Sequence, residues 1–232
     1  MPAGPISAAP GQAGVRHRLR TALAGAIVLV LLAVLATHGV TVVPDREVAS
    51  TDLAGNPSFD AGRFVAALWN ARVVPAVRDH AVEIGTVLAA LAKDADTAGA
   101  RYGHRPKSGD GPWTFLVRGE AEITAADLLS RHATLTVAVA GQDVILQIGP
   151  VVFGTALRDS LPFISFEQVV NQIQFAQVSR ELNDRATAAA RAGLDFAALV
   201  PGARVAFTGA LSATQPPQVT VVQLRVTAPA AP

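Results

Sequence analysis

The stretch "ATLTVAVAGQDVILQIGPVVFGTALRDSLPFISFEQVVNQIQFA", residues 133–176, decides the fold because its hydrophobic period changes along its length. Residues 133–150 alternate apolar and polar side chains, which predicts two β-strands around a turn at Gly141-Gln142-Asp143. Pro150 ends the second strand, since proline has no amide hydrogen to donate to a neighbouring strand. Further along, apolar residues fall at i, i+3, i+4 and i+7, the pattern of one helical face; they are Phe166, Val169, Val170 and Ile173.

This second pattern predicts a helix over about residues 166–192. Ser165 followed by Gln168 has the spacing of a capping box at its start, and Gly193 stands just after its end. Strand-like alternation flanks the unit on both sides. The alternating stretches are "WTFLVRGEAEI" (113–123) before it, and "RVAFTGALSA" (204–213) and "VTVVQLRVTA" (219–228) after it.

Three strands, a helix and two strands is the order of the oligonucleotide/oligosaccharide-binding (OB) barrel. Gly119 and Gly209 stand inside strand patterns, at places where a small barrel has to bend sharply. The predicted fold class is therefore α+β, with an OB-like five-stranded β-barrel over residues 113–228. An open α+β sandwich is the alternative.

A helical segment is expected before the barrel, over residues 59–104, and it should pack on the strands. Its apolar side chains recur at spacings near 3.6 in two groups: Phe64, Leu68 and Trp69, and Ile84, Leu88 and Leu91. Asp60 is the expected N-cap of the first helix, and Pro75 should kink or split it. Asp94 or Asp96 should cap one further short turn, which ends at Gly103.

The N-terminal region predicts a location outside the cytoplasm. Residues 1–20 have the composition of a disordered tail and end in the basic sequence "RHRLR". Residues 21–43 supply the run of about 20 apolar residues that a membrane-spanning helix needs. Arginines before that run favour a cytoplasmic N-terminus and export of everything after it. We expect an uncleaved signal anchor in the inner membrane, followed by a linker over residues 44–58; a cleaved signal peptide is the alternative.

Composition excludes several kinds of function. Lys plus Arg is 19 and Asp plus Glu is 18, so the formal charge of +1 provides no general attraction for nucleic acid. Aromatic residues are 5% of the chain, few for stacking bases. Cysteine is absent and the five histidines are isolated in sequence, so we expect neither a metal nor a cofactor. Glu120 and Glu122 share one strand face, which we interpret as its solvent-exposed side.

A cluster of polar residues interrupts the apolar runs of the opening stretch: Thr155, Arg158, Asp159, Asn171 and Gln172. One interpretation is a clasp, in which these side chains satisfy the backbone of the loop between strand and helix. The other is a polar pocket at the barrel mouth that binds a small hydroxylated ligand. Both interpretations stay open on the sequence alone.

The same stretch resembles the signature of an uncharacterised bacterial family of predicted periplasmic lipoproteins, domain-of-unknown-function family 2291. The similarity extends through "LWNARVVPAV", "FLVRGEAEI" and "VAFTGAL". This resemblance implies an envelope protein without established activity, often encoded near sugar-type ABC transport components. Relatives tend to carry a lipid-accepting cysteine before a "VVP"-like sequence, whereas "HGVTVVP" (38–44) has none. A transmembrane anchor is therefore expected in place of the lipid.

Two hypotheses of function follow. The first is a non-enzymatic, membrane-anchored accessory protein that binds a small solute or a partner such as a transporter component. The second is an envelope hydrolase, or another enzyme, that uses Asp159 with Arg158. The second hypothesis requires another titratable group within hydrogen-bond reach of Asp159, and an open cleft.

Overall fold

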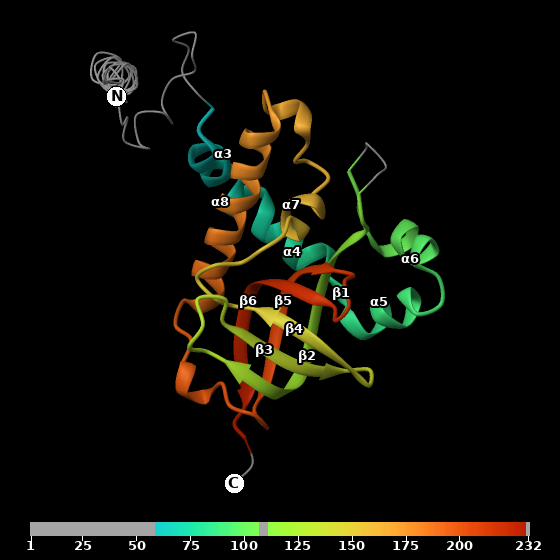
Figure 1. Ribbon diagram of the computed structural model, residues 1–232, viewed down its shortest axis with the longest axis vertical. Coiled ribbons are helices and arrows are strands. Elements are labelled where there is room, and N and C mark those ends of the chain that lie inside the picture. The colour runs from blue at the N-terminus through green and yellow to red at the C-terminus, as the bar shows by residue number, and fades with distance from the viewer. Residues whose placement is uncertain (1–58, 107–110, 231–232) are drawn as a thin grey trace, which may run out of the picture. The chain divides into compact units, whose positions relative to one another are not determined.

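The computed structural model describes residues 59–106 and 111–230. The predicted tail, membrane span and linker, residues 1–58, lie outside these residues. In the two described ranges, no helix combines the length and the apolar character that crossing a membrane requires. Helices cover one end and one side of a sheet of six strands, and the last described residues, coloured red, lie at the opposite end (Figure 1).

Five strands of the sheet pair in a closed ring. The strands are β1 (Val82–Glu83), β2 (Thr114–Asp127), β3 (Thr134–Val139), β4 (Gln142–Gln147), β5 (Arg204–Ser212) and β6 (Gln218–Ala228). Their order is β1-β2-β3-β4-β6-β5, and β2 also pairs with β5, so each strand from β2 to β6 has two neighbours. The α+β class and the predicted order of three strands, helix and two strands are confirmed. The short β1, parallel to β2, was not predicted.

The helical segment before the strands has the predicted capping. It contains α3 (Ala61–Leu68), the π-helical turn η1 (Trp69–Val73), α4 (Val74–His80), α5 (Ile84–Leu91) and α6 (Ala95–Tyr102). The side chains of Asp60 and Asp94 cap α3 and α6. Pro75 lies in the first turn of α4, directly after η1. The helix is divided there, as predicted, because proline cannot donate to the preceding turn and a π-turn accommodates its ring.

The helix predicted from residue 166 begins later, at Gln172. The capping box of Ser165 and Gln168 is present, but it holds only the 3-10 turn η2 (Phe166–Gln168). The backbone is extended at Val169 and again at Asn171, whose side chain then caps α8 (Gln172–Arg191). Both helix-start signals, six residues apart, therefore form their capping hydrogen bonds. Because the backbone between them is extended, Phe166, Val169, Val170 and Ile173 do not form one helical face as predicted.

The hairpin turn also differs by one position from the prediction. Its central residues are Ala140 and Gly141, with φ of 51° and 79°, whereas Gln142 and Asp143 belong to β4. A two-residue turn that follows the twist of both strands needs positive φ at both central positions. The remaining short helices are α7 (Ala156–Asp159) and the 3-10 turn η3 (Phe196–Ala198).

Apolar side chains form two clusters. One joins residues from all five strands of the ring with α5, and its members include Phe115, Ile123, Leu135, Leu146, Phe207 and Leu88. The other lies between the helices and the outer face of β2, β5 and β6, and includes Val65, Trp69, Leu182, Leu116, Ala210 and Val222. These three strands are therefore buried on both faces at one end, while their other end is covered on one face only.

Candidate functional site

The predicted polar cluster divides into separate local structures. Arg158 and Asp159 contact each other: Nε and Nη2 of the guanidinium each lie 2.7 Å from Oδ1 of the carboxylate. Both side chains are nearly closed off from water, with 11% and 8% of their surfaces exposed. Thr155 is exposed at the start of α7, Asn171 is the exposed cap of α8, and Gln172 is exposed in its first turn.

The Arg158–Asp159 pair connects three segments of the chain. Nη1 of Arg158 donates to the backbone oxygen of Phe175 at 3.2 Å, and the guanidinium lies 3.8 Å from the centre of the Phe175 ring. On the other side, Nδ1 of His104 lies 2.6 Å from the backbone oxygen of Asp159. Helix α7 is thereby tied both to α8 and to the segment before β2. These contacts are the kind that the clasp interpretation expects, with Arg158 bonded to a backbone oxygen of a neighbouring element.

Further clasp residues on α8 were missed in the sequence. Ser179 and Asn183 donate to the backbone oxygen of Gly154, at 3.2 and 3.0 Å, and Arg191 donates to that of Ile148 at 3.0 Å. The sequence does carry a signal for them. Ser179 and Asn183 are followed by Thr187 at the same spacing, and four-residue steps place all three on one helical face. All three are buried, so polar residues occupy part of the packed face of α8.

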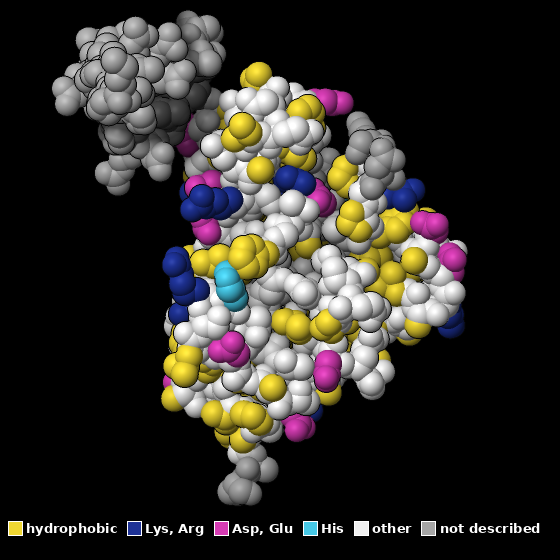
Figure 2. All heavy atoms as spheres, viewed as in Figure 1, with side chains coloured by type: hydrophobic (Ala, Val, Ile, Leu, Met, Phe, Trp, Pro, Cys, Tyr) yellow, Lys and Arg dark blue, Asp and Glu magenta, His cyan; other side chains and the backbone are white. Residues whose placement is uncertain are grey.

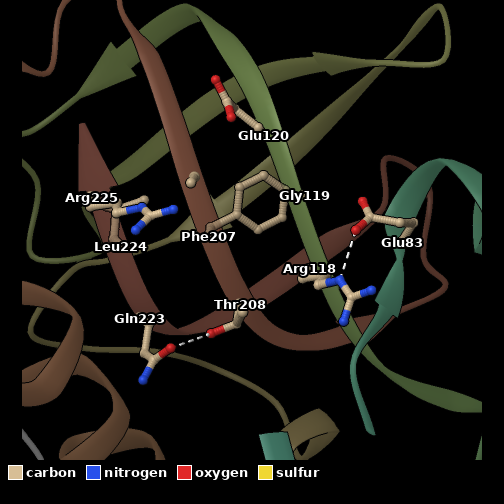
Figure 3. Close-up of a pocket in the computed structure, with 10 residues that line it drawn as sticks. Glu83, Arg118, Gly119, Glu120, Phe207, Thr208, Gln223, Leu224 and Arg225 are labelled. Atoms are coloured by element: carbon tan, nitrogen blue, oxygen red, sulfur yellow. Dashed lines mark hydrogen bonds and ion pairs between the residues drawn. The ribbon is translucent and has the colours of Figure 1, made fainter. Parts of the chain in front are cut away.

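An open groove lies on the part of the sheet that the helices leave uncovered (Figure 3). Its volume is about 520 Å³, and it is lined by Glu83, Arg118, Gly119, Glu120, Ala206, Phe207, Thr208, Gln223, Leu224 and Arg225. The strand register places the lining residues of β2, β5 and β6 in three rows: Arg118–Thr208–Gln223, Gly119–Phe207–Leu224 and Glu120–Ala206–Arg225. The small side chain of Ala206 lies between long ones, which explains why the surface is hollow there.

Hydrogen bonds and ion pairs hold most of the groove's polar side chains. Nε of Arg118 lies 2.7 Å from Oε1 of Glu83 on β1, and the hydroxyl of Thr208 donates to Oε1 of Gln223 at 3.2 Å. Both contacts are visible in Figure 3, where the Phe207 ring lies beside Gly119. A Cβ at Gly119 would lie only 3.2 Å from Cζ of that ring, so the absence of a side chain lets the ring pack there.

The carboxylate of Glu120 is held in its charged form. Its Oε1 accepts from the hydroxyl of Thr227 at 2.9 Å and lies 3.4 Å from Nε of Arg204. The Thr227 hydrogen bond, and after it the Arg204 hydrogen bond, lower the pKa of Glu120 from its ordinary value. Both of these contacts use Oε1, so Oε2 keeps its capacity to accept from a ligand.

Arg225 gives the groove a positive group that forms no close ion pair with the described residues, although its charge helps to lower the pKa of Glu120. No ion pair to Arg225 is found among residues 59–106 and 111–230, whereas Arg118 and Arg204 each pair with a glutamate. In Figure 3 its guanidinium extends from β6 towards the neighbouring strand β5, which carries Phe207. The groove thus combines a guanidinium for an anionic group with a carboxylate for hydroxyl donors. The described residues hold no cluster of three or more His, Asp or Glu side chains placed to bind a metal.

Sequence reasoning identified only part of this groove. Glu120 and Glu122 are exposed on one strand face, as predicted, and Glu120 lines the groove. Arg118, Thr208 and Arg225 were not singled out. Their alternation along each strand is readable in the sequence, but the register that aligns three strands is not.

Comparisons with known proteins agree with this fold. No curated protein matches the chain. Among solved structures, an OB-fold protein from Thermotoga maritima is similar, with a TM-score of 0.58 and 16% identity over 73% of this chain and 99% of that one. A likeness at this identity supports the OB-like arrangement and carries no information about ligands. The family described as "Predicted periplasmic lipoprotein (DUF2291)" matches residues 30–227. That match spans most of the sequence and confirms the resemblance found there, so the chain belongs to this family of predicted periplasmic lipoproteins.

Proposed function

We propose that this chain is a non-enzymatic, extracytoplasmic binding protein anchored in the inner membrane, and that its sheet groove binds a small hydroxylated carboxylate. The family description supports the location. The anchor is supported by the arginine-flanked apolar run at residues 21–43 and by the absence of a cysteine that a lipid would need. A role beside a sugar-type ABC uptake system fits this ligand class and is part of the proposal.

The observation that carries the proposal is that a carboxylate, Glu120, and a guanidinium, Arg225, stand on either side of the small residue Ala206. Arg225 supplies a planar set of donors, which binds carboxylates in a two-pronged geometry. Glu120 and Gln223 supply acceptors and donors for hydroxyl groups. The groove's volume of about 520 Å³ lies within the range of small-molecule sites.

The hydrolase alternative receives less support from the geometry. The carboxylate of Asp159 is occupied by Arg158 and nearly buried. His104 does reach Asp159, but it contacts the backbone oxygen rather than the carboxylate. A general base needs an accessible carboxylate within reach of a substrate proton, and Asp159 does not offer one.

Titration calorimetry with three probes tests the groove. We expect D-glucuronate to bind at least tenfold more tightly than D-glucose, which lacks the carboxylate, and than acetate, which lacks the hydroxyls. Arg225→Ala should weaken glucuronate binding by tenfold or more, since a hydrogen bond to a charged group contributes about 1.5–3 kcal/mol. Arg180→Ala, at an exposed position on α8 outside the groove, is the matched control. Equal affinities for the two variants, or no binding of any probe, would contradict the proposal.

The lowered pKa of Glu120 predicts how binding depends on pH. Because the lowered pKa keeps the carboxylate charged to a lower pH than an ordinary glutamate, affinity should begin to fall at a lower pH than it would with an unshifted glutamate. The shift also stabilises the fold above the unfolded-state pKa, a contribution lost as the pH falls through the folded-state value. Thr227→Val should raise the pKa of Glu120 in an NMR titration of its side-chain carboxyl. Thr208→Val should leave that pKa unchanged, because the Thr208 hydroxyl bonds to Gln223; equal pKa values in wild type and Thr227→Val would refute the assignment.

A further inference from the structure

Three large apolar side chains project into solvent at the start of α8. Phe166 belongs to η2, Val170 to the extended link, and Ile173 to the first turn of the helix; they are 42%, 83% and 71% exposed. We call these three residues the apolar tip. Figure 2 shows hydrophobic side chains gathered at this end of the molecule. A cluster of exposed large apolar groups is a mark of an interaction surface.

The tip is held in shape by local hydrogen bonds. The backbone NH of Val170 donates to Oε1 of Gln174 at 2.9 Å, and the Phe166 ring meets the Phe175 ring edge-on at 5.6 Å. The capping interactions of Ser165 and Asn171 lie on either side. The exposed positions are therefore not those of a frayed helix end, because both starts are capped.

The chain enters the described domain through the same group of helices. Phe59, the first described residue, packs against the same buried apolar cluster as Phe163, Val169 and Phe175. The predicted membrane span ends at residue 43, and residues 44–58 connect it to Phe59. A chain of that length reaches at most about 50 Å when fully extended. A linker of that length allows the tip to reach the bilayer in which the chain is anchored.

We infer that the apolar tip inserts into the extracytoplasmic surface of the membrane in which the chain is anchored. This inference rests on the anchor in the proposed function. Glu167, the one charged side chain between Phe166 and Ile173, is acidic, so attraction to anionic lipid does not drive the contact. Contact is instead apolar, with zwitterionic lipid, and should change little with salt.

Site-specific fluorescence tests the inference directly, because the chain contains no cysteine of its own. The full chain with Ile173→Cys, labelled with an environment-sensitive fluorophore, is reconstituted in vesicles of phosphatidylcholine and phosphatidylethanolamine. We expect blue-shifted emission and several-fold stronger quenching by spin-labelled lipid than for a label at Leu129→Cys. The expected difference should persist at high salt.

Leu129 is a matched control because it is apolar and fully exposed, at 101%, but lies far from the tip. It belongs to the connection between β2 and β3, where the backbone oxygen of Arg131 accepts from the backbone NH of Val151. That connection neighbours the segment bonded to Arg191, the last residue of α8. A helix of 20 residues is about 30 Å long, so the two labels report on opposite ends of α8.

Flotation of the vesicles shows which inference is wrong, the insertion of the apolar tip or the anchor in the membrane. If the protein floats with the vesicles while both labels stay equally aqueous, the tip inference is wrong and the anchor stands. If the protein does not float, both are wrong. A blue shift at residue 173 that depends on protein concentration and not on lipid would mean that a second copy covers the tip, which also overturns the inference.

Discussion

Replacing Arg158 by alanine is expected to lower the free energy of unfolding by about 3–5 kcal/mol, because it leaves the carboxylate of Asp159 buried without its partner. The substitution also removes the donor to Phe175 on α8. For a domain of this size such a loss lowers the melting temperature by roughly 10 °C. Urea denaturation and scanning calorimetry measure both quantities.

The chain offers a close control in Arg78 and Asp79. These residues are also sequence neighbours, and their Nε–Oδ1 distance is 2.7 Å, as it is in the Arg158–Asp159 pair. Their side chains are 66% and 52% exposed, however, so solvent screens the pair. Arg78→Ala should therefore leave the free energy of unfolding nearly unchanged. If Arg78→Ala and Arg158→Ala lost the same free energy of unfolding, burial would not be the reason why the Arg158–Asp159 pair stabilises the fold.

A double substitution separates two quantities: the net contribution of the ion pair to stability, and the penalty of leaving one buried charge without its partner. Replacing Arg158 and Asp159 together by leucine removes both charges, and exchange of a buried ion pair for apolar residues is often close to neutral. We expect the double variant to be more stable than Arg158→Ala. If the pair is a clasp, Arg158→Ala should still bind D-glucuronate below its melting temperature with wild-type affinity, because neither residue lines the groove.

Local signals were sufficient for much of the fold. Asp60 and Asp94 cap helices as predicted, since an N-cap depends on a side chain and the amides two or three residues later. The alternation in β2 identified its inward residues, because side-chain direction along a strand has a fixed period. The start of α8 was predicted too early, again because the prediction used only local signals. Two valid local signals, at Ser165 and Asn171, occur in series, and periodicity alone does not decide between them.

The groove depended on information that no local pattern contains. Glu120 and Arg225 lie more than a hundred residues apart in sequence and meet only because β5 pairs with both β2 and β6. Sequence reasoning treated Glu120 as an ordinary exposed residue, which describes its exposure correctly but not its surroundings. Contact between Arg158 and Asp159 was easier to foresee, because the two residues are adjacent in sequence. Asn171 comes from the next element and caps α8 instead of joining them.

Replacing Gly209 by alanine is expected to cost about 3 kcal/mol, at the upper end of what overpacking usually costs. A Cβ at this position would lie 2.2 Å from the backbone oxygen of Thr220 and 2.9 Å from Cγ1 of Val219 on β6. The neighbour is backbone within a paired strand, so it cannot turn aside as a flexible side chain would. The register between β5 and β6 shifts at this point, between Thr208 and Gly209, which brings the two backbones together.

The effect of Gly209→Ala should reach the groove as well as the core. Thr208 precedes Gly209 and bonds to Gln223, so a displaced β5 would disturb the row Arg118–Thr208–Gln223. We expect weaker D-glucuronate binding in this variant even in the folded fraction, in contrast to Arg158→Ala. Gly85→Ala is the control: a Cβ there meets nothing within 4 Å, and alanine is favoured over glycine in a helix by about 1 kcal/mol. Urea denaturation of both variants measures the free energy of unfolding. A Gly209→Ala protein as stable as wild type would mean that β5 and β6 do not approach so closely.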